Sequence, residues 1–495
     1  MANVLASRLM VVALRPRVFV ESTLHPSVSD ELVARDLLAL PVSPALADMR
    51  IAIDDPKCRA LLVHVKSPTT DPNQATRLAA ILDHLARPAL DNGVLVTLVI
   101  EGSAADQVSA IQAVYQRFKL TGNVDTFRYR PNIIAWVPTV VGPLAQACAR
   151  HEPGPAWRAL TVVMTTDKPI HASDRRLLER AFSDCDRLEV TLLQERSARV
   201  GRVSVYRVQP ARADRPDPVP FIVKIGHPEV IDAEEGATAW ACGDHTPYPY
   251  FPPLTPDRNV SGRDRRALVS QFVDRAILFE HYIRSHSPAV AVASLFDGPL
   301  RCWRSHSRSE QVHIGRYVLE NGLVRRWLGA YRNVYRRAQR LHAGVRTPAL
   351  LIDALRNVPA MAVNICGAHG DLHVRNLFVR ENSVDIVLID FNRAGEAPAS
   401  RDPAELEVSL AFSQAAPGEA AIDATTLQAL YSGPLLKRTD LARQGHPRVL
   451  AIEQVRRQVA GAVTEAEYSA MVGAHCLYFA RKGNVDAYLA ANRLI

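Results

Sequence analysis

The C-terminal half of the chain contains a set of side chains whose types and spacing suit phosphoryl transfer. Residues 369–376 read His-Gly-Asp-Leu-His-Val-Arg-Asn, which places the carboxylate of Asp371 five residues before the carboxamide of Asn376. Asp390 follows fourteen residues later, at the end of a short apolar run. In phosphoryl transfer, one carboxylate orients the attacking hydroxyl and accepts its proton, while a second carboxylate and an amide oxygen hold Mg²⁺ against the phosphates. Mg²⁺ suits such a set because it takes a few hard oxygen ligands and leaves positions for phosphate oxygens and water.

A lysine in an otherwise apolar row provides a second element of this chemistry. Lys224 lies within Phe-Ile-Val-Lys-Ile at residues 221–225 and is one of only seven lysines in the chain. Phosphate binding needs a compact ammonium, which a glutamate on a nearby helix holds in place. The pattern from Ile231 to Trp240 predicts a helix on which Glu234 and Glu235 share one side. Either glutamate can face Lys224, and we favour Glu234.

Together these segments resemble the aminoglycoside phosphotransferase and choline kinase-like branch of the protein-kinase-like fold. The resemblance rests on His-Gly-Asp-x-x-x-x-Asn followed by Ile-Asp-Phe, and on the helix-like segment at 404–407 with Asp402 nearby. It covers roughly residues 186–495, and a weaker resemblance is to kinase-like domains of bacterial signalling and conflict systems. The resemblance implies ATP and Mg²⁺ as cofactors. It also implies these roles: catalytic base for Asp371, magnesium ligands for Asn376 and Asp390, and the small-lobe ion pair for Lys224 and Glu234.

The expected phosphate loop departs from the pattern of this branch. Two predicted strands, 188–193 and 203–208, flank Ser-Ala-Arg-Val-Gly at 197–201, where a Gly-rich loop would normally cover the phosphates. Ser197 and Ala198 are small enough to let the backbone approach phosphate, so we assign Ser197 and Gly201 to the predicted nucleotide site. Of the two histidines in the catalytic segment, His369 is expected to hydrogen-bond nearby backbone and His373 to have a structural role.

The N-terminal part of the chain alternates between strand-like and helix-like patterns. Apolar runs at 61–65, 94–100 and 160–164 predict buried strands, and helical spacing recurs at 72–85 and 104–118. Ser173-Asp174 is expected to cap a further helix that ends near Phe182. Such alternation favours a parallel sheet covered by helices. We find no catalytic motif there, and His64 is expected to be a hydrogen-bonded core histidine, so this part is predicted to be a binding or regulatory module.

The predicted fold class is therefore an α/β N-terminal domain followed by an α+β, two-lobed, protein-kinase-like domain. The expected boundaries are 1–185 for the α/β domain, 186–275 for the small lobe and 276–495 for the large lobe. In the large lobe we expect a long helical pattern at 323–341, strands at 377–379 and 386–389, and a final helix at 485–494.

Composition narrows the partners and the location. The formal net charge is +8, and 52 of the 59 basic residues are arginines spread along the chain, so a nucleotide fits the charge and a nucleic acid partner is not expected. Seven widely spaced cysteines contain no C-x-x-C pair, which predicts neither zinc nor disulfides and a reducing compartment. The apolar run at 9–14 is too short for a signal peptide, and no run of 18 apolar residues occurs. We therefore expect a cytoplasmic protein without a membrane span.

Two functional hypotheses follow from the sequence. The first is an ATP- and Mg²⁺-dependent phosphotransferase that acts on a hydroxyl of an unidentified small molecule or protein. The second is a kinase-fold adaptor, a pseudokinase of a bacterial signalling or conflict system, with a protein partner bound through its N-terminal domain. The full set of key residue types favours the enzyme, whereas the single-glycine loop and the extra domain favour the adaptor.

Overall fold

The structure is a computed structural model that divides into two compact units. The first unit comprises residues 1–232 and 254–272, and the second comprises 233–253 and 273–495. Helix α9 (Pro228–Trp240) begins in the first and ends in the second, where a π-helical turn, η2 (Ala241–His245), follows it. The structure describes residues 17–35, 37–55, 58–66, 71–85, 88–89, 92–106, 108–109, 112, 133–136, 144–145, 148, 160–198, 201–212, 219–245, 250–262, 265–324, 327–380, 382–414, 421–437 and 445–495.

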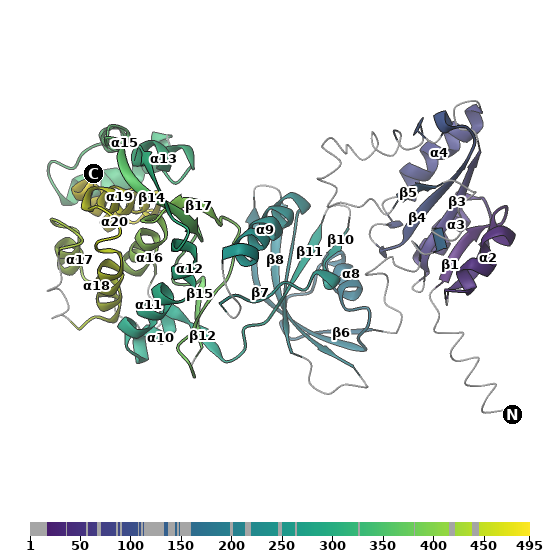
Figure 1. Ribbon diagram of the computed structural model, residues 1–495, viewed down its shortest axis with the longest axis horizontal. Coiled ribbons are helices and arrows are strands. Elements are labelled where there is room, and N and C mark those ends of the chain that lie inside the picture. Colours follow the sequence, from purple (N-terminus) through teal and green to yellow (C-terminus); the bar gives the residue numbers. More distant parts are fainter. Residues whose placement is uncertain are drawn as a thin grey trace. The chain divides into compact units, whose positions relative to one another are not determined.

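The N-terminal part of the first unit forms a five-stranded sheet in the order β2-β1-β3-β4-β5 (Figure 1). All four strand pairs are parallel. The strands are β1 (Arg17–Glu21), β2 (Leu38–Val42), β3 (Cys58–Lys66), β4 (Leu95–Glu101) and β5 (Ile133–Trp136). The helices between them are α2 (His25–Val33), α3 (Leu46–Asp54) and α4 (Pro72–His84). Most of the helix expected at 104–118 lies outside the described residues.

Both faces of this sheet are covered, which explains why its central strands are continuously apolar. Alternate residues of β3 enter two separate cores: Leu61 and Val63 join the core beneath α3 and α4, whereas Leu62 joins the one beneath α2. His64 is buried and hydrogen-bonds Glu101 Oε2 at 2.9 Å and Thr23 Oγ1 at 3.1 Å. The prediction of a hydrogen-bonded core histidine is confirmed.

The remainder of the first unit is a six-stranded sheet in the order β10-β11-β9-β8-β7-β6. Its strands are β6 (Thr161–Met164), β7 (Arg187–Ala198), β8 (Gly201–Ala211), β9 (Phe221–Gly226), β10 (Val260–Ser261) and β11 (Arg266–Gln271). A short 3₁₀ helix, η3 (Pro256–Arg258), precedes β10. β6 pairs with β7 in parallel, and the other pairs are antiparallel. The boundary expected at residue 186 therefore falls between two paired strands, and we keep the three-part organisation as a proposal with β6 attached to the small-lobe sheet.

Helix α8 (Ala172–Ala181) covers one face of this sheet through Leu177, Leu178 and Phe182. The prediction that Ser173-Asp174 caps the helix is wrong, because the N-cap residue is His171 and Asp174 lies inside the first turn. Asp174 is fully buried and accepts hydrogen bonds from Arg202, Tyr206 and Arg265. Its side chain thus binds α8 to the sheet rather than to its own backbone.

The register of β9 shows which way Lys224 points. Val223 and Ile225 belong to the core beneath α8, so the alternation of a strand directs Lys224 to the opposite face of the sheet. Lys224 lies opposite Val205 of β8 and Leu268 of β11, and its side chain is 8% exposed. Lys224 therefore lies on the face of the sheet opposite α8, and it is shielded from water there.

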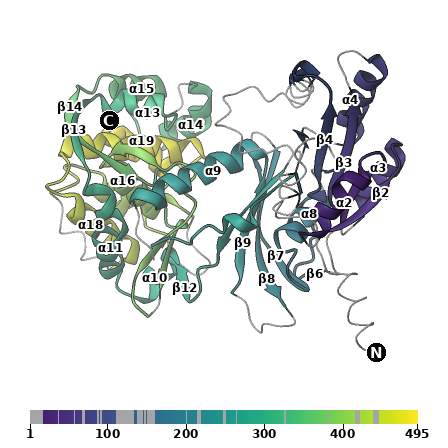
Figure 2. The same cartoon turned by 45° about the vertical axis from the view of Figure 1, so that its right-hand side comes forward.

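The second unit is mainly helical (Figure 2). Its helices are α10 (Phe279–Ser285), α11 (Pro288–Asp297), α12 (Pro299–Arg304), α13 (Ile314–Glu320), η4 (Leu328–Tyr331), α14 (Arg332–Leu341), α15 (Pro348–Arg356), α16 (Arg401–Phe412), α17 (Ala424–Leu430), α18 (Pro447–Val459), α19 (Glu465–Arg481) and α20 (Val485–Leu494). Two small sheets have the orders β12-β15-β16 and β13-β14-β17. Their strands are β12 (Ala276–Leu278), β13 (Arg308–Val312), β14 (Met361–Ala368), β15 (Leu377–Arg380), β16 (Ile386–Leu388) and β17 (Gly395–Pro398).

One continuous apolar core holds this unit together. It runs from α10 through α20 and includes both sheets. The C-terminal helix and the strands expected near 377 and 386 are confirmed, and so is the prediction of mixed α and β content. The helix expected over 323–341 is wrong in its first half, because α14 begins only at Arg332. None of the helices in the described part of the chain is both long and apolar enough for a membrane span.

Candidate active site

Residues 369–376, which the sequence predicts to be catalytic, form a tight loop between β14 and β15. We call this segment the catalytic loop. His373 N donates to Asp371 O at 3.0 Å, and Asn376 N donates to His373 O at 2.9 Å. The ring of His369 is buried, and its Nε2 lies 2.8 Å from Ile389 O. This contact confirms the expected backbone hydrogen bond of His369. It also ties the loop to the strand end that carries Asp390.

The loop brings together Asp371, Asn376 and Asp390. Asn376 Nδ2 donates to the backbone oxygen of Asp371 at 2.9 Å, which leaves Oδ1 as the oxygen of that side chain available for a ligand. Ile389 N donates to Asn376 O at 3.1 Å, so Asp390 is the next residue along from a direct link to Asn376. Three of the residues singled out from the sequence thus lie on two hydrogen-bonded segments of the second unit.

Asp390 has an unusual backbone conformation for a residue other than glycine. Its φ is +65°, in the left-handed region, which aspartate enters more readily than most residues but at some cost. The preceding β16 and the turn in which Ala394 N donates to Phe391 O fix the chain on both sides. Such strain persists only where the surroundings impose it, and it often marks a functional residue.

The oxygens at this point suit a hard divalent cation. Asn376 offers Oδ1, Asp390 a carboxylate, and the buried Oδ1 of Asn392 has no hydrogen-bond partner. No group of three or more His, Cys, Asp and Glu side chains that could enclose a metal occurs among the described residues. An arrangement of few protein oxygens is the one Mg²⁺ uses when substrate phosphates complete its coordination. The residues present therefore fit Mg²⁺ bound together with a nucleotide.

Helix α16 supports the loop from behind. Asp402 accepts the backbone N–H groups of His369 at 2.7 Å and Gly370 at 2.9 Å, while Arg401 donates to Gly370 O at 3.0 Å. Further along the helix, Ser409 Oγ accepts the N–H of Val374 at 3.3 Å. Because these groups bind backbone atoms, they fix the position of the loop without occupying the side chains of Asp371 or Asn376.

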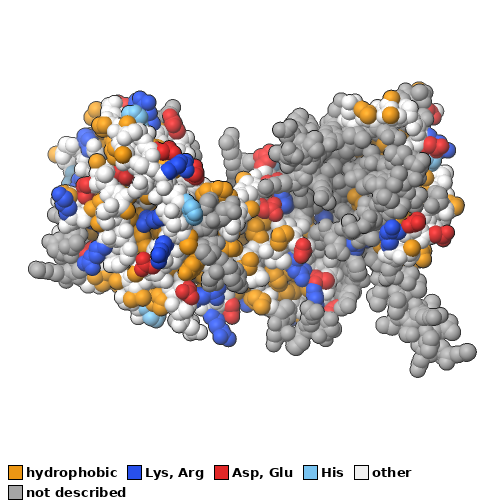
Figure 3. All heavy atoms as spheres, in the orientation of Figure 1, with side chains coloured by type: hydrophobic (Ala, Val, Ile, Leu, Met, Phe, Trp, Pro, Cys, Tyr) orange, Lys and Arg blue, Asp and Glu red, His pale blue; other side chains and the backbone are white. Residues whose placement is uncertain are grey.

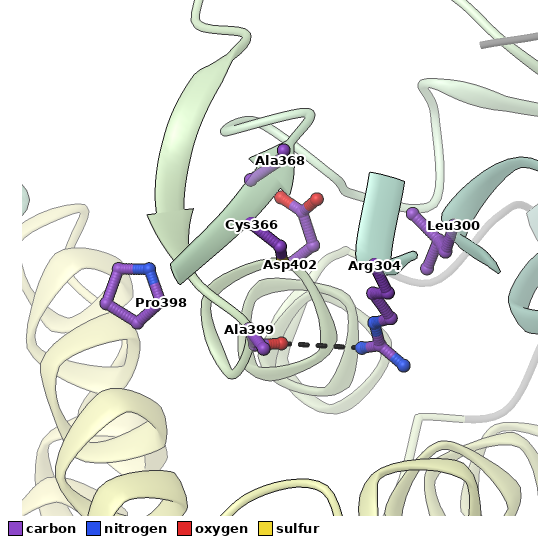
Figure 4. A pocket seen from close by; sticks show the side chains of 8 residues that line it. Leu300, Arg304, Cys366, Ala368, Pro398, Ala399 and Asp402 are labelled. Atoms are coloured by element: carbon purple, nitrogen blue, oxygen red, sulfur yellow. Dashed lines mark hydrogen bonds between the residues drawn. The ribbon is translucent and has the colours of Figure 1, made fainter. Parts of the chain in front are cut away.

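A pocket with about 220 Å³ of empty space lies beside this support (Figure 4). It is lined by Leu300, Arg304, Cys366, Gly367, Ala368, Pro398, Ala399 and Asp402. Arg304 donates to Ala399 O at 3.3 Å, and burial lowers the pKa of its guanidinium. Both charged side chains of the pocket, Arg304 and Asp402, hold backbone atoms, so the pocket belongs to the support of the loop.

Asp402→Ala is expected to loosen the catalytic loop. The change removes the acceptor from two buried N–H groups, at a cost of about 3 kcal/mol. Amide hydrogen exchange over residues 366–376 should then become about a hundredfold faster. The control is Glu310→Ala, which removes half of an exposed pair with Arg308 and should leave exchange of this segment unchanged. Equal exchange in wild type and Asp402→Ala would show that α16 does not hold the loop.

Two further ionisable groups surround Asp371. Arg393 Nη1 lies 3.5 Å from Asp371 Oδ1, and its side chain is 46% exposed. Glu405 of α16 is buried, and burial together with the charge of Asp371 raises its pKa well above the usual value. Burial also lowers the pKa of His373, whose Nδ1 accepts the N–H of Arg375 at 3.2 Å. The hydrogen bond from Arg375 N agrees with the structural role expected for His373.

The remaining predicted site residues belong to other parts of the chain. Gly201 pairs with Ala198 at the end of β7 and β8 and has φ +94°, a conformation that favours glycine. Ser197 lies opposite Arg202 in the same ladder, but its side chain and residues 199–200 lie outside the described residues. On α9, Glu234 is 6% exposed and Glu235 is more exposed, so burial favours Glu234. Lys224 belongs to the other compact unit, and its pairing with Glu234 stays a prediction.

Sequence analysis missed several residues of this site. It noted Asp402 only as a neighbour of a helix and gave no role to Arg393, Arg401 or Glu405. Their contacts depend on how α16 crosses behind the loop, which no local pattern reports. The sequence did contain one signal for Arg393. It follows Asp390 by only three residues, so it belongs to the turn that starts at Asp390.

Comparison with known proteins supports the motif-based interpretation for part of the chain. Residues 306–431 match the model of the phosphotransferase enzyme family, designated APH. No curated protein matches the chain. Similar solved structures include an amicoumacin kinase in complex with AMP-PNP and Ca²⁺, with 11% identity, a TM-score of 0.32 and coverage of 62% of this chain and 86% of that one. Another is an ethanolamine kinase from Plasmodium vivax, with 12% identity, a TM-score of 0.29 and coverage of 64% and 84%.

The matched segment contains the catalytic loop, Asp390 and the helices from α13 to α17. Residues 306–431 thus resemble the phosphotransferase enzyme family, as the His-Gly-Asp-x-x-x-x-Asn motif and the following Ile-Asp-Phe predicted.

Proposed function

We propose that the chain is an ATP- and Mg²⁺-dependent phosphotransferase that moves the γ-phosphoryl group to a hydroxyl. The observation that carries this proposal is the hydrogen-bonded assembly of Asp371, Asn376 and Asp390. Asn376 keeps its Oδ1 available, and Asp371 and Asp390 each supply a carboxylate. The left-handed backbone of Asp390 also supports the proposal, because such strain is concentrated at functional sites.

In the proposed reaction, the oxygen of the acceptor hydroxyl attacks the γ-phosphorus of ATP. The new oxygen–phosphorus bond forms as the bond from the γ-phosphorus to its bridging oxygen breaks, and ADP leaves with that electron pair. The hydroxyl proton passes to an oxygen of Asp371, which must lie within hydrogen-bond reach of the hydroxyl. Asp371 is partly exposed, so an acceptor can reach it from solvent.

Binding of the phosphates involves the remaining residues. When bound, Mg²⁺ would neutralise charge on the phosphate oxygens, and Asn376 and Asp390 would hold it. Lys224, with Glu234 as its proposed partner, would bind the phosphates nearer the nucleoside. The backbone around Ser197 and Gly201 would approach the phosphates at the end of the β7–β8 ladder. These small-lobe roles rest on the sequence resemblance and on the burial of Lys224.

Asp390→Ala should abolish stabilisation by Mg-ATP. A ligand present at a hundred times its Kd stabilises the folded protein by about 2.7 kcal/mol, so wild type should melt several degrees higher with Mg-ATP. Asp390→Ala lacks the carboxylate that is proposed to hold Mg²⁺ against the phosphates. The increase in melting temperature with Mg-ATP should therefore vanish. The matched control is Asp385→Ala on the adjoining hairpin, whose carboxylate accepts a hydrogen bond from Ser383, and this variant should keep the shift. A wild type that shows no shift at millimolar Mg-ATP would contradict the proposal.

A further inference from the structure

The catalytic loop and the turn after Asp390 contain few exposed charged side chains. Residues 369–376 and 389–402 are described in full. Within them, Asp371 and Asp390 serve the chemistry and Asp402 holds backbone, while Glu396 forms a double hydrogen bond with Arg308. The exposed charges that remain at these two segments are therefore Arg375 and Arg393, both positive.

Only one of these two arginines lies beside the proposed base. Arg393 Nη1 is 3.5 Å from Asp371 Oδ1, whereas Arg375 lies near Glu280, at 3.8 Å from its Oε2. The backbone of Arg393 is held in two ways: Ala394 N closes a turn onto Phe391 O, and the carbonyl oxygen of Arg393 packs against Gly370. Gly370 has φ +75°, and a Cβ there would collide with that oxygen. The guanidinium is thus anchored at its base while its nitrogens reach the rim of the site.

A guanidinium in this position competes with the acceptor hydroxyl for the carboxylate of Asp371. A second anion next to the hydroxyl would draw Arg393 away from Asp371, because a guanidinium binds carboxylates and phosphates through paired hydrogen bonds. An acceptor with an ammonium group would instead meet repulsion from the same side chain. We propose that Arg393 determines acceptor specificity and selects a hydroxyl that neighbours an anionic group, a carboxylate or a phosphate. This inference rests on the proposed phosphotransferase function.

The surroundings of the loop agree with this assignment. Lys482, exposed at the end of α19, lies close enough to His373 to lower its pKa further. On the face of the second unit that Figure 3 shows, basic and acidic side chains are interspersed.

The test compares three acceptors that share two adjacent hydroxyl-bearing carbons and differ at the third carbon. Glycerate has a carboxylate there, glycerol a hydroxyl group and aminopropanediol an amino group. The kcat/KM value for each acceptor is measured from acceptor-dependent ADP release. Binding of each acceptor is measured from its inhibition of intrinsic Mg-ATP hydrolysis. Wild type should use or bind glycerate at least about tenfold better than glycerol, and aminopropanediol worst, as expected for a charge-assisted hydrogen bond. Arg393→Gln should remove this order, Arg393→Glu should reverse it, and Arg393→Lys should partly retain it. Arg375→Gln, which removes the same charge from the other exposed arginine, should leave the order unchanged.

The outcomes that overturn the inference are distinct from failure of the proposed function. If Arg393→Gln slows all three acceptors by the same factor, the guanidinium acts on the transferred phosphoryl group and not on the acceptor. If wild type treats glycerate and aminopropanediol alike, both in turnover and in competition, Arg393 has no role in specificity. Both results count against the inference alone when Mg-ATP still raises the melting temperature in an Asp390-dependent manner. Loss of that shift in wild type would remove the proposed function and the inference with it.

Discussion

Asp371→Ala should lower the rate of phosphate transfer by about 10²- to 10⁴-fold, the usual contribution of a general base. Nucleotide binding should survive, because Asn376 hydrogen-bonds the backbone oxygen of Asp371 and not its carboxylate. The loop also keeps its contacts to Asp402 and Ile389, which involve residues 369 and 370. Mg-ATP should therefore raise the melting temperature of the variant as much as that of wild type. Turnover is followed by ADP release and binding by thermal denaturation.

Asp371→Asn separates the loss of the base from the loss of the side chain. Asparagine keeps the shape of aspartate and can still contact Arg393, but it cannot take up the hydroxyl proton. Both variants should thus be slow to a similar extent. If either variant autophosphorylates or hydrolyses ATP as fast as wild type does, Asp371 is not the base. A wild type that binds Mg-ATP yet transfers no phosphate to any hydroxyl would favour the adaptor hypothesis.

The proximity of the residues proposed to hold Mg²⁺ could be predicted because they lie close together in the sequence. A loop and two short strands separate Asp371 from Asp390, so the spacing alone limits how far apart they can lie. Lys224 was recognisable for another reason, since one charge in an apolar strand demands a partner and the structure shows the side chain to be 8% exposed. Arg393 and Asp402 were not recognised as functional, because their roles arise from contacts between segments that only the folded chain brings together.

The same distinction applies to the fold. Continuous apolar runs predicted the middle of β3 and nearly all of β4, and helical patterns predicted α4 and α20 close to their observed bounds. Asp174 was misread because Ser-Asp at a helix start usually caps the helix, whereas here the donors come from β8 and from Arg265, far along the chain. The helix expected at 323–341 was wrong in its first half because apolar spacing continues through the 3₁₀ helix η4, after which α14 begins.

Helix α16 couples the catalytic loop to the core through a second, deeper contact. Glu407 is fully buried and forms two hydrogen bonds with Arg456 of α18, at 2.7 and 3.0 Å. Tyr468 of α19 donates to the same carboxylate at 2.8 Å, and burial beside Glu407 raises its pKa well above the usual value. Arg456 also donates to Leu430 O at 3.1 Å. One carboxylate thus joins three helices beneath the residues that hold the loop.

Glu407→Leu should be among the most destabilising single changes in the second unit. It leaves the guanidinium of Arg456 buried without a counter-charge and deprives Tyr468 of its acceptor, at an expected cost of about 3–5 kcal/mol. Urea denaturation followed by circular dichroism should show the midpoint move to lower urea. Hydrogen exchange should locate the loss in α16, α18 and α19, and exchange of the catalytic loop should rise with it because Asp402 shares α16.

The double variant Glu407→Leu/Arg456→Met distinguishes a buried ion pair from a packing defect. Once both charges are gone, no group remains in the core that must be kept from water alone, so the double variant should be more stable than Glu407→Leu. If the two single changes simply add, Glu407 and Arg456 stabilise the core by their volume and not as a pair. Hydrogen-exchange protection of the catalytic loop can also be compared between the single and double variants. If it recovers in the double variant, α16 needs only close packing against α18, and no charge, to hold Asp402 against the catalytic loop.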